Sequence, residues 1–315
     1  MAGQPRKHHF VPQFYLAGFT QSDSKDGDLF VLDKERKATW KSTPKGTAHK
    51  RDFHAIDDKA GGDAMAIEKK LAHLEGQWSA VLADVIETRA IPEDESFGDL
   101  MMFVAFMAVR VPPIRNILSD FIDRLSKAQI NMMLSTKEGQ ASFRKTLADL
   151  GHTMIDEEFE RLVEFGRSEE YDVNYEQTWH VQEMVRMGIT LAPLLSLRKW
   201  RLWQADDSAP DLICSDRPVA PTWLTPMPGP ISPAFGTPNT IVSIPLNRRI
   251  AMVSLIEEEL PDMPLDEQGV AMVNSMTGLY SNQLFSSAPD FVWAMKDGRV
   301  GRSQDLLKAL QEGGK

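Results

Sequence analysis

The spacing at which apolar residues recur changes twice along this 315-residue chain, and these changes restrict its fold class. Residues 28–32 and 38–41 read as two strands joined by a charged turn. Between about residues 64 and 195, apolar residues recur every three to four positions, which is typical of helices with one buried face. Strands are expected again at 199–205, 211–215, 240–244, 250–255 and 291–295. We therefore predict an α+β fold, in which an antiparallel sheet built from the N-terminal hairpin and the C-terminal strands packs against a large helical middle region.

The helical segments and the domain boundaries follow from the same pattern. Helices are expected over residues 64–88, 96–109, 114–134, 139–150, 156–167, 174–190 and 266–286. The segment 96–109 is apolar on almost every side, so we expect it to be the most buried helix, and Pro112 and Pro113 prevent it from continuing. We treat residues 1–300 as a single α+β domain with a helical subregion at about 64–195. Residues 301–315 are expected to be a flexible tail.

Composition points to a cytoplasmic protein. The longest apolar run, Leu100–Val109, is too short to span a bilayer. The first residues contain no apolar stretch, so we expect no secretion signal. The single cysteine, Cys214, has no partner for an internal disulfide. We therefore expect no membrane contact. The sequence does not indicate an oligomeric state.

Charge is distributed unevenly along the chain. The net charge of −10 disfavours indiscriminate binding of nucleic acid. Residues 1–51 nevertheless carry ten Lys or Arg and only five Asp or Glu, a net charge of +5. Such a segment could receive nucleic acid or another phosphate-bearing ligand, with Lys50 and Arg51 as substrate contacts. The alternative is that this segment is the solvated face of a hairpin.

The pair His8 and His9 stands just before a short helix that Pro12 should begin and Gly18 should end. Adjacent residues of an extended segment point in opposite directions, so one histidine should face a site while the other packs. Histidine serves as a general acid, a general base or a metal ligand near neutral pH, so both are catalytic candidates. Tyr15 is a candidate substrate contact. The alternative is that both histidines only bond backbone atoms.

Two acidic residues and one arginine form the next group of candidates. Glu68 and Glu75 lie two helical turns apart, on one flank of the apolar face. They could bind a divalent cation, Mg²⁺ or Mn²⁺, or pair with Arg110. Arg110 ends the all-apolar helix and must find carboxylates, carbonyls or an anionic ligand, so it is a catalytic candidate. The alternatives are solvated carboxylates and a purely structural ion pair.

A further candidate stands at the end of the predicted strand 211–215. Side chains at strand ends are held rigidly, and sites often form there. Asp216 is therefore a catalytic and metal-binding candidate, and Ser215 a substrate contact. The alternative is an ordinary turn in which Asp216 bonds the following backbone. Cys214, within the strand, is expected to pack rather than to react.

Several well-known catalytic patterns are absent from the sequence. It has no Walker A loop, no G-x-G-x-x-G, no H-E-x-x-H, no G-x-S-x-G and no paired C-x-x-C. Nucleotide-binding, zinc-protease and α/β-hydrolase designs are therefore disfavoured.

Three motifs together carry a resemblance to a known family. The segment His8-His9-Phe10-Val11-Pro12-Gln13-Phe14-Tyr15-Leu16 resembles the N-terminal signature H-H-x-V-P-x-x-Y-L-x-x-F of a bacterial and phage family, domain of unknown function 4238 (DUF4238). The segment Ser215-Asp216-Arg217-Pro218-Val219 is similar to its S-D-x-P-V motif, Arg110 and Pro112 are similar to its R-x-P, and Glu68 and Glu75 fall on its first long helix. The likeness spans most of residues 8–290. It implies an intracellular microbial setting and no established reaction.

The chain departs from the family pattern at two places. Asp52-Phe53-His54 stands where the pattern has an aromatic segment ending in Tyr, and Cys214 stands where it has Thr. His54 is therefore not carried over as a site residue.

Two functions remain open from the sequence. The first is a metal-dependent phosphodiester hydrolase, nuclease-like, acting in phage–host conflict. The second is a non-catalytic module that binds a ligand or a protein and uses the same residues as a structural polar network. The hydrolase requires His8, Glu68, Arg110 and Asp216 to converge in space.

Overall fold

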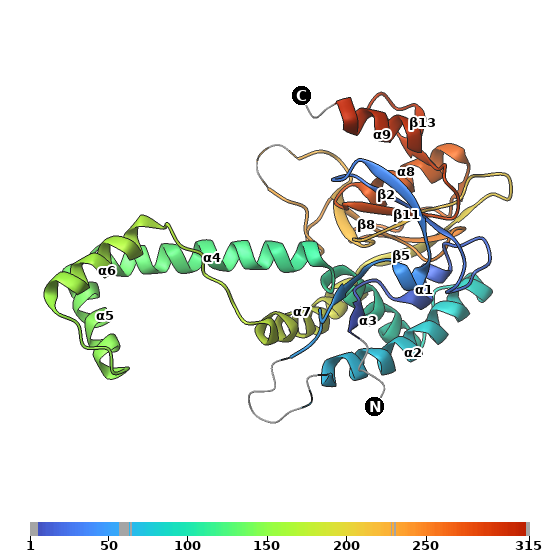
Figure 1. The fold of residues 1–315 in the computed structure, drawn as a ribbon. Coiled ribbons are helices and arrows are strands. Elements are labelled where there is room, and N and C mark those ends of the chain that lie inside the picture. Colours follow the sequence, from blue (N-terminus) through green and yellow to red (C-terminus); the bar gives the residue numbers. More distant parts are fainter. Residues whose placement is uncertain (1–5, 57–62, 64, 228, 230, 313–315) are drawn as a thin grey trace. The chain divides into compact units, whose positions relative to one another are not determined.

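The computed structural model describes residues 6–56, 63, 65–227, 229 and 231–312. Its mixture of helices and largely antiparallel sheets confirms the predicted α+β class (Figure 1). The chain divides into two compact units: the first extends to Val111 and resumes at Val181, and the second is Pro112–His180. Much of the expected helical subregion therefore belongs to the first unit. The boundary of 1–300 as one domain stays a prediction.

The first unit contains a five-stranded sheet with strand order β10-β5-β9-β8-β7. Every residue of its two central strands is buried, so both faces of the sheet are covered there. All neighbouring pairs are antiparallel except β10 with β5. The strands are β5 (Lys199–Ala205), β7 (Ala220–Trp223), β8 (Thr240–Pro245), β9 (Ile250–Leu255) and β10 (Pro264–Leu265).

A four-stranded antiparallel sheet joins the two ends of the chain in the same unit. Its order is β3-β2-β11-β6, with bounds Ala38–Ser42, Leu29–Asp33, Gln283–Ser286 and Cys214–Ser215. Figure 1 shows β2 beside β11, and the register places Leu32 opposite Leu284. The prediction that the N-terminal hairpin pairs with C-terminal strands is confirmed. The strands divide between two larger sheets, however, where we expected one.

Two short ribbons complete the strands of the described residues. The first pairs β1 (Lys7–His9) with β4 (His49–Arg51), and the second pairs β12 (Val292–Ala294) with β13 (Val300–Arg302). Helix α9 (Ser303–Glu312) follows β13 directly. Its Leu306 and Leu310 pack against a buried apolar cluster, so the expected flexible tail is wrong for residues 301–312. Residues 313–315 lie outside the described residues.

The helices of the first unit surround a continuous apolar core. They are α1 (Gln13–Ala17), the 3₁₀ turn η1 (Pro44–Gly46), α2 (Ala66–Thr88), α3 (Ser96–Val109), α7 (Gln177–Ser196, from Val181 onward) and α8 (Glu267–Gly278). Pro12 and Gly18 flank α1, as expected. Helix α3 is buried at nine of its fourteen residues, including every residue from Phe103 to Val109, which agrees with the expected burial of this helix. Trp78 of α2 packs on Phe103 and Phe106 of α3.

Helix α8 is shorter than the expected helix over 266–286. It ends at Gly278, and residues 283–286 form β11 instead. Strand β11 hydrogen-bonds β2 on one side and β6 on the other, so its backbone groups are paired between strands rather than within a helix. Tertiary pairing therefore overrides the local helical pattern here.

The second unit is helical within its described residues. It contains α4 (Pro112–Leu134), α5 (Lys137–Asp149) and α6 (Asp156–Ser168), around a small core of Leu134, Phe159 and Val163. Gly166 permits close packing, since a Cβ there would lie 2.6 Å from Leu134 Cδ1.

No single helix among the described residues is long and apolar enough to cross a membrane. Helices α3 and α4 pass a test of length and composition only when they are taken together as a bent pair.

Candidate functional site

His8 is held inside the first unit by the β1–β4 ribbon, in which it lies opposite Lys50. Its side chain is fully buried. Its Nδ1 accepts a hydrogen bond of 2.9 Å from the backbone N–H of His54. An accepting Nδ1 carries no proton, so neutral His8 has its proton on Nε2. The ribbon and this bond therefore set both the position and the tautomer of the imidazole.

His54 follows β4 after a turn at Asp52, whose backbone is left-handed (φ 53°). The imidazole of His54 is also fully buried, and its Nδ1 lies 2.8 Å from Oε2 of Glu68 on the first turn of α2. Because an ionised carboxylate only accepts hydrogen bonds, Nδ1 of His54 donates and Nε2 keeps a free lone pair. Glu68 thereby orients the ring.

Glu68 brings the two imidazoles into one group, which we call the histidine cluster (His8, His54 and Glu68). Oε2 of Glu68 lies 3.6 Å from Nδ1 of His8, and the two rings stack with centroids 5.7 Å apart. One ligand atom from each residue lies within 4.8 Å of the other two. In the part of the chain that the structure describes, Nε2 of both histidines is buried without a hydrogen-bond partner.

Electrostatics favour a neutral imidazole beside an ionised carboxylate. Burial lowers the pKa of His54 to about 4, although the hydrogen bond to Glu68 acts in the opposite direction. Burial alone would raise the pKa of Glu68, but the hydrogen bond from His54 and nearby positive charge outweigh it and lower that pKa. At neutral pH, His54 is therefore uncharged and Glu68 is ionised.

Arg110 ends α3 beside the histidine cluster, and only 2% of its side chain is exposed. Its Nη2 donates to the carbonyl oxygen of His9 at 2.5 Å and pairs with Oε1 of Glu75 at 2.8 Å. The charge of Arg110 also acts on the pKa values of His54 and Glu68, which places it near both. Its Nε and Nη1 are buried with no protein hydrogen-bond partner among the described residues.

His9 and Glu75 contact other groups than the cluster. Nδ1 of His9 lies 3.3 Å from Nε2 of Gln13, and its ring meets the ring of His49 edge-on. Burial lowers the pKa of His9 to about 4. His8 and His9 thus face different surroundings, as expected for neighbours on a strand. Glu75 pairs with Arg110 rather than joining Glu68 around a shared cation.

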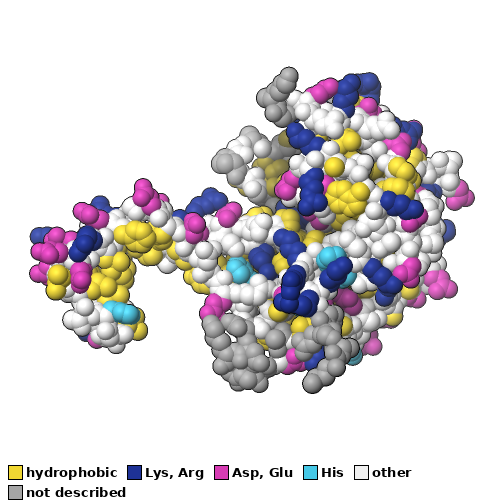
Figure 2. Space-filling view, viewed as in Figure 1, with side chains coloured by type: hydrophobic (Ala, Val, Ile, Leu, Met, Phe, Trp, Pro, Cys, Tyr) yellow, Lys and Arg dark blue, Asp and Glu magenta, His cyan; other side chains and the backbone are white. Residues whose placement is uncertain are grey.

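Lys50 and Arg51 lie on β4 and are exposed. Nε of Arg51 is 3.5 Å from a carboxylate oxygen of Asp52, which also pairs with Arg6. Figure 2 shows several Lys and Arg side chains close together on the face that it presents, with His side chains among them. The ribbon that holds His8 therefore carries positive charge at its surface.

Tyr15 and Ser215, both predicted as substrate contacts, are core residues instead. Tyr15 is fully buried, donates from its hydroxyl to the carbonyl oxygen of Pro245 and packs against Phe103. Ser215 is fully buried and donates to the carbonyl oxygen of Thr277. Cys214 is buried, and burial raises the pKa of its thiol, which agrees with a packing role.

Asp216 lies at the edge of the four-stranded sheet and not with the histidine cluster. Its Oδ1 accepts from the backbone N–H of Asn282, and Lys34 is the nearby cation. Burial raises its pKa to about 6. It shares no contact with His8, Glu68 or Arg110 in the described chain. The predicted convergence is therefore correct for those three residues and wrong for Asp216. Strand β6, which directly precedes Asp216, pairs with β11 in the four-stranded sheet, whereas β1 pairs with β4 in a separate ribbon.

His54 is the cluster member that the sequence interpretation misses, since the family pattern has Tyr at this place. No signal in the sequence identifies it, because the pairing of β1 with β4 that brings it near His8 joins residues about forty positions apart.

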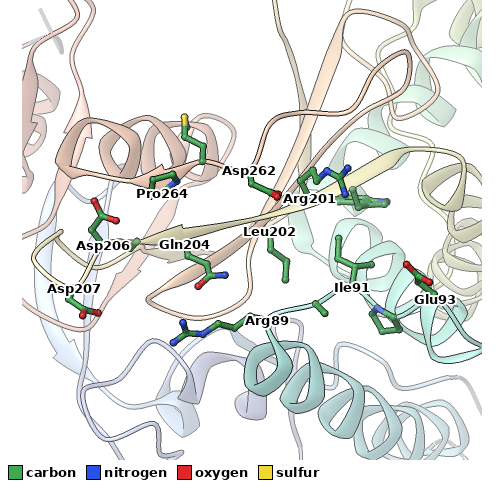
Figure 3. Close-up of a pocket in the computed structure, with 15 residues that line it drawn as sticks. Arg89, Ile91, Glu93, Arg201, Leu202, Gln204, Asp206, Asp207, Asp262 and Pro264 are labelled. Atoms are coloured by element: carbon green, nitrogen blue, oxygen red, sulfur yellow. The ribbon is translucent and has the colours of Figure 1, made fainter.

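A cavity lies elsewhere in the first unit. It has a volume of about 840 Å³ and lies between β5, the segment after α2 and residues 262–264. Figure 3 shows Gln204 and Leu202 of β5 facing the segment that contains Arg89 and Ile91. None of the predicted site residues lines it.

The histidine cluster can do two things chemically. Neutral His54, oriented by Glu68, can accept a proton at Nε2. Two imidazoles and one carboxylate can also bind a divalent transition metal ion. In either case Arg110 can donate hydrogen bonds from Nε and Nη1 to an anion.

A family model described as a protein of unknown function (DUF4238) matches residues 7–286, a span that includes the whole histidine cluster and Arg110. No curated protein and no solved structure matches the chain. The chain therefore belongs to the DUF4238 family.

Proposed function

We propose that this chain is a nuclease-like phosphodiester hydrolase that uses the histidine cluster and Arg110. One observation carries the proposal: His8, His54 and Glu68 meet within 4.8 Å, beside a buried arginine that has two nitrogens without protein partners among the described residues. Buried polar atoms are nearly always hydrogen-bonded in native proteins. Such atoms next to a histidine–carboxylate pair indicate that a ligand completes the site.

The chemistry of phosphodiester hydrolysis matches these groups. The oxygen of water bonds to phosphorus, the bond from phosphorus to the leaving oxygen breaks, and the proton released by water is transferred to that leaving oxygen. The histidine cluster activates the water. Arg110 stabilises the negative charge that develops on the phosphoryl oxygens.

The exposed side chains of Lys50 and Arg51 support a polyanionic substrate. Positive charge on a substrate-binding ribbon attracts the phosphates of a nucleic acid without reading its sequence. The family resemblance, which is to bacterial and phage proteins, supports a cytoplasmic role in phage–host conflict as part of the same proposal.

The test is cleavage of end-labelled RNA and DNA by the purified chain with Mg²⁺, Mn²⁺ or EDTA. We expect His54→Ala to lose cleavage while its melting temperature and circular dichroism stay close to those of the wild type. His73→Ala is the matched control, because His73 lies exposed on α2, the same helix as Glu68. Undiminished cleavage by a folded His54→Ala protein would refute the assignment of the site.

A specific observation favours a second candidate, a non-catalytic binding module. The bonds from Arg110 to the His9 carbonyl and from the His54 backbone to His8 anchor β1 to the rest of the unit. If this anchoring is the whole role of the network, His8→Ala, which removes the acceptor of the His54 N–H, should lower the melting temperature strongly, and the wild type should cleave neither nucleic acid.

A further inference from the structure

We infer that the histidine cluster binds one first-row transition metal ion, of the Zn²⁺ or Mn²⁺ class, through His8, His54 and Glu68. The inference rests on the proposed function for what the ion does, but whether the ion binds is a separate question with its own measurement.

The spacing of the donor atoms fits a single ion. With metal–ligand bonds of about 2.1 Å, neighbouring ligand atoms lie roughly 3.0–3.4 Å apart in octahedral or tetrahedral geometry. Oε2 of Glu68 lies 2.8 Å from Nδ1 of His54 and 3.6 Å from Nδ1 of His8. Shifts of a few tenths of an ångström bring these pairs to the expected separations. An ion bound through both Nδ1 atoms replaces the hydrogen bonds that these atoms make in the metal-free chain.

The protein builds this site from rigid parts. His8 is fixed in the β1–β4 ribbon, and Glu68 stands on the first turn of α2. Both imidazoles are fully buried, and Nε2 of each has no protein hydrogen-bond partner in the described ranges. Each ring can therefore carry its proton on Nε2 while its Nδ1 binds the ion.

The donor set selects the kind of ion. Mg²⁺ prefers six oxygen ligands, and carboxylates also suit Mn²⁺, whereas imidazole nitrogens suit Zn²⁺ and Fe²⁺. The two imidazoles therefore favour Zn²⁺ most. Of the two ions expected from the sequence, Mn²⁺ fits this mixed donor set better than Mg²⁺, because Mn²⁺ is a transition metal ion. The expected ligand set of Glu68, Glu75 and Asp216 is replaced as well, since only Glu68 lies with the histidines.

The surrounding charge is compatible with a divalent cation. Arg110 would repel an ion, but Glu75 lies 2.8 Å from its Nη2 and offsets that charge. Glu68 supplies a negative ligand at the site itself. Three protein ligands leave at least one position for water, whose pKa such an ion lowers, so the ion would generate the nucleophile that the proposed hydrolysis needs.

The experiment measures metal binding directly and without substrate. The full chain is treated with EDTA, desalted, and titrated with Zn²⁺, Mn²⁺ or Mg²⁺ by calorimetry, and the bound metal is counted by elemental analysis. Co²⁺ serves as a spectroscopic probe, since its visible absorption reports nitrogen ligands. We expect one ion of Zn²⁺, Mn²⁺ or Co²⁺ per chain, and much weaker binding of Mg²⁺.

Variants assign the ligands. His8→Ala, His54→Ala and Glu68→Gln should each weaken binding by at least about tenfold. Glu68→Gln keeps the size of the side chain, so it decides the question if a histidine variant fails to fold. His73→Ala and Glu87→Gln are matched controls, because both residues are exposed on α2. Wild-type affinity in Glu68→Gln, or no binding of Zn²⁺, Mn²⁺ or Co²⁺ by the wild type, overturns the inference.

The two proposals fail separately. Cleavage that resists EDTA, in a protein that binds no metal, would leave the hydrolase standing and remove the metal site. Stoichiometric metal binding without cleavage of any phosphodiester would support the metal site and remove the hydrolase.

Discussion

Replacing Arg110 by Met tests how the cation is held in the core. The variant keeps an unbranched apolar side chain but removes the charge-assisted hydrogen bond to the His9 carbonyl, which contributes about 2 kcal/mol. It also leaves the carboxylate of Glu75 without its cation. That carboxylate is 26% exposed and can be hydrated, so its isolation adds only about 1 kcal/mol. We expect Arg110→Met to lower the free energy of unfolding by about 3 kcal/mol.

The double variant separates the two contributions. Glu75→Gln alone should cost about 1 kcal/mol, because the amide oxygen still accepts from Arg110. In Arg110→Met/Glu75→Gln, no isolated carboxylate remains, so the loss should be about 2 kcal/mol, smaller than for Arg110→Met alone. The assay is urea unfolding in EDTA, followed by tryptophan fluorescence. An Arg110→Met protein as stable as the wild type, or strictly additive losses, would refute this account of the ion pair.

Two further predictions concern the effect of pH on stability and the role of Asp216. Because burial lowers the pKa of His54 from 6.5 to about 4, the unfolded chain binds more protons between these values, and stability is lost as the pH falls through this window. Between pH 7 and pH 5 the wild type should lose about 2 kcal/mol more than His54→Ala, measured by urea unfolding, and equal losses would contradict the buried neutral imidazole. Asp216→Asn should leave both metal affinity and cleavage at the wild-type level, since Asp216 lies apart from the cluster; a large loss of either would return Asp216 to the site.

The parts of the fold that were predictable depend on local patterns. Helix α3 is apolar on all sides and ends before two prolines, so both its burial and its end follow from the sequence. The β2–β3 hairpin follows from two short strand-like segments joined by a charged turn. Strand β11 was mistaken for helix because its four residues have no strong pattern, and pairing with β2 and β6 decides their conformation.

The candidate site was predictable only for residues whose chemistry is unusual in their setting. An arginine at the end of an apolar helix and adjacent histidines before a short helix both require partners, and the structure supplies them. His54 gave no such signal, because its role depends on a ribbon that pairs residues more than forty positions apart. Asp216 misled because a carboxylate at a strand end is equally well explained by the turn that it stabilises.

Helix α2 carries both Glu68 and Glu75, and this has a mechanical consequence. Seven residues separate them, about 10.5 Å along the axis of one rigid rod. One carboxylate holds the imidazole of His54 and the other holds the guanidinium of Arg110. A displacement of α2 must therefore move both partners together and in the same direction. The packing of Trp78 against α3 therefore helps to fix the positions of both carboxylates at once.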